Sequence, residues 1–129
     1  MGPPVENAVP AAKSMPSRAL AAVRYALRGV GFMLAERNCQ VLAAATVAAV
    51  AAGGYFRLSA AEWCAVVLAI TAIWVAEGLN TAIERLTDLV SPGYHPLAGR
   101  AKDIAAGAVL LAALGAISTG IIIFGPRLV

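Results

Sequence analysis

Three apolar stretches dominate this chain and restrict it to folds that cross a lipid bilayer. They cover about residues 38–56, 60–80 and 104–124. About 20 helical residues at 1.5 Å rise each are enough to cross the ~30 Å hydrocarbon layer, so each stretch can span it once. Charged residues make up only 13% of the chain, against about 25% in a soluble domain. We therefore expect an all-α membrane protein with three transmembrane helices.

The second of these helices is expected to extend beyond the membrane. Ser59-Ala60-Ala61-Glu62 has the capping-box pattern that begins a helix, and Ser91-Pro92-Gly93 ends it near Val90. Counted from Ala60, Glu77 lies roughly 26 Å along the helix and Glu84 roughly 36 Å. Glu77 is thus placed near the far edge of the hydrocarbon, and the extension to residue 90 lies in the interfacial zone.

The segment before the first span has two parts. Residues 1–16 contain four prolines and no long apolar core, so we expect a disordered tail and no secretory signal peptide. Residues 17–35 have an apolar stripe on one face, while Arg24 and Arg28 share another face. This pattern is typical of an amphipathic helix that lies on a membrane surface. The stripe consists of Leu20, Val23, Leu27, Val30 and Leu34.

The distribution of lysine and arginine predicts the orientation in the membrane. Positive residues collect on the cytoplasmic side of membrane proteins. Eight flank the spans on one side and two on the other: Lys13, Arg18, Arg24, Arg28, Arg37, Arg85, Arg100 and Lys102 against Arg57 and Arg127. The N-terminus and the loop over residues 85–103 are therefore expected in the cytoplasm. The formal net charge of +3 is too small and too scattered to suggest a nucleic-acid partner.

A one-sided polar stripe marks the end of the second helix. Its members follow one another at i, i+3, i+7 and i+11, which places them on one helical face: Glu77, Asn80, Glu84 and Asp88. A helix that simply reaches water explains Arg85 and Thr87, but it explains a one-sided acidic stripe less well. Ionisable groups near lipid are costly and therefore indicate a functional site.

The residue types in this region suit metal and phosphate chemistry. Mg²⁺ prefers oxygen ligands and often binds one or two carboxylates together with substrate phosphates. Glu84 and Glu36 could supply these carboxylates if the two helix ends meet, and Lys102 and Arg100 could neutralise phosphate charge. Glu77, at the lipid edge, could accept a proton from an alcohol. These are the parts that phosphoryl transfer to a lipid needs.

Other chemistries find no support in the sequence. No phosphate-binding loop of the G-x-x-x-x-G-K-[ST] type is present. His95 is the sole histidine, which excludes a site with several histidine ligands. Cys39 and Cys64 are predicted at opposite ends of neighbouring spans, beyond disulfide reach.

Two segments carry a family resemblance. Glu77-Gly78-Leu79-Asn80-Thr81-Ala82-Ile83-Glu84 with Asp88, and Tyr94-His95-Pro96-Leu97-Ala98-Gly99-Arg100-Ala101-Lys102-Asp103 beyond it, resemble the small bacterial integral-membrane diacylglycerol kinase family, which includes undecaprenol kinases. Glu36-Arg37-Asn38 resembles the E-R-N segment of that family. The resemblance covers about residues 17–125, so residues 17–129 are predicted to form one lipid kinase domain.

The resemblance implies a role for each matching residue. Glu77 matches the proton acceptor that activates the lipid hydroxyl and contacts the lipid substrate, and Glu36 and Glu84 match the carboxylates that bind the metal of the nucleotide. ATP, as substrate, and Mg²⁺ are implied with them. The implied nucleotide-binding residues are Arg18, Tyr25, Glu36, Asn80, Glu84, Asp88, Gly93, Tyr94, His95, Lys102 and Asp103. The family also implies a homotrimer with composite sites, in the bacterial cytoplasmic membrane.

The sequence departs from the family in two places. The stretch over residues 29–36 is one residue shorter than expected, which blurs the register of the surface helix and of Arg18 and Tyr25. Cys39-Gln40-Val41-Leu42 stands where the family often has a basic residue and a histidine. This removes charge beside Glu36.

The function expected from the residues and the resemblance is ATP- and Mg²⁺-dependent phosphorylation of a membrane lipid hydroxyl. Diacylglycerol and undecaprenol are the leading acceptors. The alternative is a small proton-coupled exporter that uses Glu77 as its carrier. An exporter needs no cluster of Glu84, Asp88, Lys102 and Asp103, and it usually has an internal repeat, which the sequence lacks. A membrane subunit without chemistry would leave the acidic stripe unexplained.

Overall fold

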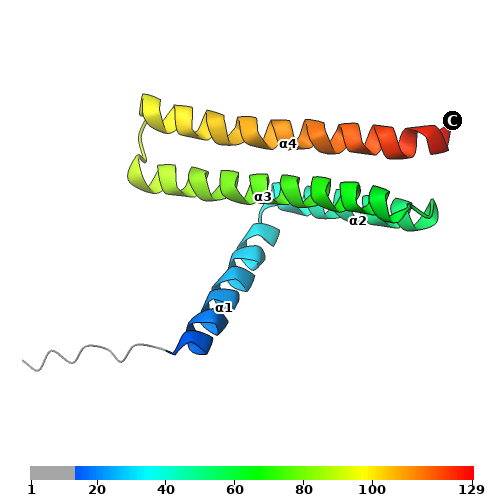
Figure 1. Cartoon of the computed structure of the whole chain (residues 1–129). Coiled ribbons are helices and arrows are strands. Elements are labelled where there is room, and N and C mark those ends of the chain that lie inside the picture. The colour runs from blue at the N-terminus through cyan, green and yellow to red at the C-terminus, as the bar shows by residue number, and fades with distance from the viewer. Residues whose placement is uncertain (1–13) are drawn as a thin grey trace, which may run out of the picture. The chain divides into compact units, whose positions relative to one another are not determined.

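The computed structural model describes residues 14–129, and over that part of the chain it contains helices and connecting loops but no strands. Its four helices are α1 (Met15–Leu34), α2 (Arg37–Tyr55), α3 (Ala60–Val90) and α4 (Pro96–Leu128) (Figure 1). Three of them, α2, α3 and α4, are long and apolar enough to cross a membrane. This confirms the predicted all-α fold class, with one helix followed by three that are long and apolar enough to span a membrane.

The chain divides into two compact units, residues 1–32 and 33–129. Residues 1–13, the greater part of the predicted tail, lie outside the described residues. Helix α1 begins at Met15, two residues before the predicted start, because the Ser14 carbonyl already accepts the backbone N–H of Arg18 (3.1 Å). No residue of α1 is buried, so its apolar stripe is uncovered. Its place on a membrane surface stays a prediction.

Helix α3 is the centre of the second unit. It packs against α4 on one side and against α2 on another (Figure 1). In the middle of the spans, the indole Nε1 of Trp74 donates a hydrogen bond to Thr46 Oγ1 (3.0 Å) and so links α3 to α2. The hydroxyl of Thr46 in turn donates to the Leu42 carbonyl (2.8 Å). These two bonds satisfy the polar groups of Trp74 and Thr46 between the helices.

The two ends of α3 agree with the sequence signals. At the start, Ser59 Oγ accepts the N–H of Glu62 (3.3 Å) and the Glu62 carboxylate accepts the N–H of Ser59 (2.8 Å), which completes the predicted capping box. At the other end, the N–H of Ser91 donates to the Thr87 carbonyl (2.8 Å), and the helix ends at Val90.

The loop assigned to residues 85–103 is largely helical: α3 runs to Val90, as predicted, and the helix over residues 96–103 is a correction. The connection between α3 and α4 covers only residues 91–95, and α4 begins at Pro96 rather than near residue 104. The reason is local: His95 is the N-cap, its Nδ1 accepts the N–H of Leu97 (3.1 Å), and Pro96 occupies the first helical turn. Hydropathy marks where an apolar run begins, not where a helix begins.

The end of the bundle where α3 begins is closed by packing and one ion pair. Leu58, Val66 and Ile123 form a buried cluster. The Arg127 guanidinium near the end of α4 binds the Glu62 carboxylate (2.8 Å) in the first turn of α3. The two cysteines are free, as predicted: Cys39 is buried and Cys64 is exposed.

A glycine pair in α2 provides a test of this packing. A Cβ on Gly53 would lie 2.7 Å from Cη2 of Trp63, a rigid ring that cannot yield easily, whereas a Cβ on Gly54 would meet no atom within 4 Å. We expect Gly53→Ala to lower the free energy of unfolding by about 1–3 kcal/mol through overpacking. Gly54→Ala is the matched control and should keep or slightly raise stability, by up to about 1 kcal/mol. Denaturation in detergent measures both, and equal stability of the two variants would contradict this packing.

Candidate active site

The polar stripe of α3 passes from a buried to an exposed environment. Glu77 and Asn80 are each 7% exposed, whereas Glu84 and Asp88, one and two turns further along, are exposed. All four lie on one helical face because their spacing follows the helical repeat. One end of the stripe is therefore shielded from water, and the other end reaches it.

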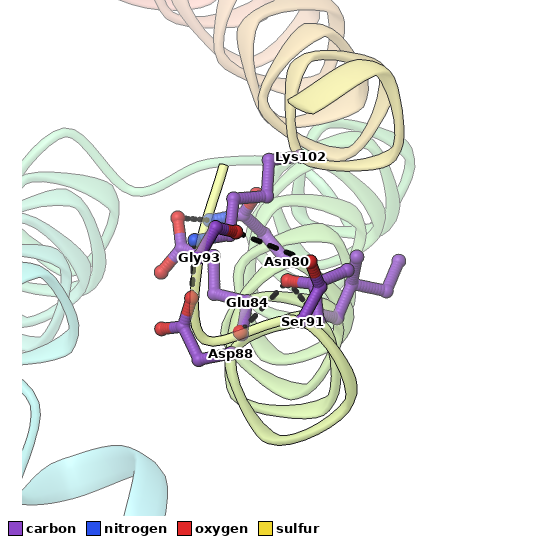
Figure 2. Close-up of polar contacts among 8 residues, drawn as sticks. Asn80, Glu84, Asp88, Ser91, Gly93 and Lys102 are labelled. Atoms are coloured by element: carbon purple, nitrogen blue, oxygen red, sulfur yellow. Dashed lines mark hydrogen bonds and ion pairs between the residues drawn. The ribbon is translucent and has the colours of Figure 1, made fainter. Parts of the chain in front are cut away.

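Asn80 holds Glu84 and carries an unsatisfied acceptor. Its Nδ2 donates to Glu84 Oε1 (3.1 Å), as Figure 2 shows. Its Oδ1 is buried and has no hydrogen-bond partner within the described residues. A buried acceptor without a partner is costly, and such a group in a native structure calls for a donor or a cation.

Glu36 reaches the same turn of α3 through an arginine. It is the N-cap of α2, but its side chain caps no backbone group of the helix. Its carboxylate instead forms an ion pair with Arg85, the residue after Glu84. The sequence analysis assigned Glu36 and Glu84 to one metal site on the condition that the two helix ends meet. The structure brings Glu36 to this turn but pairs it with Arg85, a residue that the stripe analysis treated only as a solvated helix end.

The beginning of α2 and the residues before it cover the turn of α3 that contains Glu77. A Cβ on Gly78 would lie 2.8 Å from Cε of Met33, so the Met33 side chain occupies the space that this glycine leaves open. Cys39 is completely buried and lies within electrostatic reach of Glu77 and Glu36. No sequence pattern marked Met33, because this contact depends on how the helices pack.

The loop between α3 and α4 forms a polar pocket beside the exposed end of the stripe. Lys102 Nζ on α4 binds Asp88 Oδ1 on α3 (2.5 Å), and the Ser91 hydroxyl donates to the Gly93 carbonyl (3.1 Å) (Figure 2). The pocket has a volume of about 270 Å³. Five predicted site residues line it: Asp88, Gly93, Tyr94, His95 and Lys102.

Other predicted residues are not brought to this pocket. Asp103 follows Lys102 on α4 and is exposed. Arg18 and Tyr25 lie on α1, in the other unit, and both side chains are exposed. The roles of all three stay predictions.

The residues around the Asn80–Glu84 turn of α3 suit a metal ion that would arrive with a phosphate. The described part of the chain holds no group of three or more His, Cys, Asp or Glu side chains that could bind a metal by themselves. It does offer the carboxylates of Glu84 and Glu36 and the unpartnered Oδ1 of Asn80, all hard oxygen donors. Mg²⁺ commonly binds one or two carboxylates and completes its shell with phosphate oxygens and water. The donor set fits that mode.

Comparison with known proteins places the chain in a family. The sequence profile of prokaryotic diacylglycerol kinases matches residues 24–124. An undecaprenol kinase from Bacillus subtilis (strain 168) is 45% identical over 93 residues, which cover 72% of this chain and 76% of the relative. A diacylglycerol kinase from Synechocystis sp. is 41% identical over 103 residues, 78% of this chain and 59% of the relative.

A shorter match agrees with these two. A diacylglycerol kinase from Escherichia coli (strain K12) is 45% identical over 47 residues, 36% of this chain and 38% of the relative. The family profile covers most of the chain, and the stripe on α3 and the loop before α4 both lie within it. The chain therefore belongs to the prokaryotic diacylglycerol kinase family and is a lipid kinase.

Proposed function

We propose that this protein transfers the γ-phosphate of MgATP to the hydroxyl of a membrane lipid. The observation that carries the proposal is the graded stripe of α3. A buried carboxylate, Glu77, shares one helical face with Glu84 and Asp88, which reach water beside a polar pocket. A lipid alcohol and a soluble nucleotide can meet only where such a face crosses the membrane interface.

In this proposal Glu77 is the general base. It lies 17 residues after Ala60, at the depth where the hydrocarbon layer ends. Because Glu77 is buried, water is kept away from its carboxylate. The carboxylate therefore accepts its proton from the lipid hydroxyl. Positioned bases of this kind contribute roughly 10²–10⁴-fold to a rate.

Glu84 and Glu36 would hold the Mg²⁺ that accompanies ATP, with Asn80 Oδ1 as a further oxygen donor. The metal ion would neutralise charge on the phosphate groups. The bond from Asn80 to Glu84 keeps that carboxylate in one orientation. The pocket beside Asp88 and Lys102 is the proposed place for the nucleotide. The Lys102 amine can bind a phosphate group once it separates from Asp88.

Undecaprenol is the acceptor that we propose first. The match covers 76% of the length of the Bacillus subtilis undecaprenol kinase. It covers only 59% of the Synechocystis diacylglycerol kinase and 38% of the one from Escherichia coli. Diacylglycerol remains the second acceptor, because the base needs only an alcohol at the interface. A proton-coupled exporter is not favoured, since it gives no role to the pocket or to the Asp88–Lys102 pair.

We also propose a homotrimer in the bacterial cytoplasmic membrane, with the N-terminus and residues 91–95 in the cytoplasm. Small residues on α4 support self-association: apart from the helix's own backbone, a Cβ on Gly107, Gly115 or Gly120 would meet no atom of the described residues within 4 Å. Such positions let membrane helices from other subunits approach closely. The positive-inside count supports the orientation.

The role of Glu77 is tested by Glu77→Gln. We expect at least a ~100-fold loss of turnover, because the base is removed, with MgATP affinity largely retained, because no metal ligand is lost. Transfer of label from MgATP to undecaprenol and to diacylglycerol, offered in parallel in mixed micelles, measures the first quantity. Wild-type turnover in the variant would refute the role. No transfer to either lipid by the folded wild-type protein would refute the proposed acceptors.

The role of Glu84 is tested by Glu84→Gln, with Glu62→Gln at the opposite end of α3 as the matched control. We expect the Mg²⁺ concentration needed for half-maximal activity to rise by at least about tenfold, together with weaker nucleotide binding. The control should show neither change, since Glu62 pairs with Arg127 far from the pocket. An unchanged Mg²⁺ titration in Glu84→Gln would exclude this carboxylate as a ligand.

A further inference from the structure

Arg85 stands out because the proposed function leaves it without a role. It follows Glu84 directly, but it lies about 100° around α3 from the acidic stripe. Its guanidinium pairs with the Glu36 carboxylate, 49 residues earlier in the chain. The Arg85 side chain is 72% exposed and that of Glu36 is 32% exposed. The pair joins the start of α2 to the part of α3 that extends beyond the membrane.

Structural stabilisation alone is a weak explanation for this pair. Ion pairs between exposed side chains contribute little to folding, because water screens both charges and the long side chains lose freedom. The same weakness makes the pair easy to exchange. The carboxylate of Glu36 is also one of the two proposed for the metal ion, and a guanidinium held against it opposes the approach of a divalent cation.

The chemistry of arginine supplies a second partner. Its planar fork of donors matches phosphate oxygens in a bidentate arrangement. Arg85 follows Glu84 in the sequence. When its guanidinium leaves Glu36, it therefore stays close to Glu84, the other carboxylate proposed to bind the metal. The phosphates of a nucleotide bound there would come within its reach.

We propose that Arg85 exchanges partners during nucleotide binding. In the ligand-free protein it neutralises Glu36 and holds the start of α2 against α3. When a divalent cation takes the Glu36 carboxylate, Arg85 moves to a phosphate oxygen of the nucleotide. This inference rests on the proposed function for the identity of the nucleotide, but the competition at Glu36 can be measured without lipid or nucleotide.

The experiment compares the purified full-length wild type with Arg85→Gln and Arg85→Lys in detergent. Without nucleotide, Mn²⁺ binding followed by electron paramagnetic resonance should be about two- to fivefold tighter in Arg85→Gln, because an exposed ion pair opposes binding by about that factor. MgATP binding should be about tenfold weaker, because a charge-assisted contact is lost. Arg85→Lys should stay near the wild type for Mn²⁺ and bind MgATP with intermediate affinity.

Two further variants separate competition from a structural effect. Arg127→Gln makes the same change in an Arg–Glu pair about 35 Å away along α3, and it should leave both affinities unchanged. In a Glu36→Gln background, Arg85→Gln should no longer alter Mn²⁺ affinity, since the contested carboxylate is gone.

The outcomes decide between the alternatives. Unchanged or weaker Mn²⁺ binding in Arg85→Gln would overturn the exchange, and so would unchanged MgATP binding. If Arg85→Gln does not fold, Arg85→Lys still tests the exchange, because unchanged MgATP affinity in that variant would overturn it. If Mn²⁺ binds more tightly to Arg85→Gln but the wild type phosphorylates no lipid, the proposed function is contradicted. The competition at Glu36 is then still supported.

Discussion

The length of α3 is the constraint on which the rest of the structure depends. Its 31 residues extend about 46 Å, well beyond the ~30 Å hydrocarbon layer. An excess of this size cannot stay in lipid, so the last turns enter the interface while remaining rigid. A single unbroken helix thereby carries the buried Glu77 and the exposed Glu84 and Asp88 on one face, with no loop between them. Under the proposed function, helical rise alone sets the separation between the base and the nucleotide site.

The acidic side chains of the candidate site are held by charged or polar partners. Glu36 is paired with Arg85, Asp88 with Lys102, and Glu84 accepts a hydrogen bond from Asn80. Three of the acids at this end of the bundle, Glu36, Glu84 and Asp88, therefore have a partner within the described residues. Exposed pairs are weak, so they keep the acids in place without a large barrier to exchange. A binding site for a highly charged ligand needs that combination, because the ligand must replace each partner as it enters.

The sequence allowed much of this to be predicted, for identifiable reasons. The spans, the capping box at Ser59 and the stripe on α3 depend on local pattern, and the structure contains them. The start of α4 was placed too late, because the cap at His95 and Pro96 lies in a polar stretch that hydropathy does not recognise as helix. The Glu36–Arg85 pair and the contact of Met33 with Gly78 depend on tertiary packing, and no spacing rule reveals them. The site roles taken from the family resemblance remain predictions for the experiments above.

The order of the helices has a consequence for how the protein is made. Helix α3 packs on the span before it and the span after it, through connections of four residues, 56–59, and five residues, 91–95. Short connections make loop closure entropically cheap, and contacts between successive elements favour fast folding. Each span can therefore pack as it emerges during synthesis. The site is completed last, because Glu36 precedes α2 whereas Lys102 arrives only with α4. A chain interrupted before α4 would retain two packed spans and the acidic stripe, but it would lack the wall of the polar pocket.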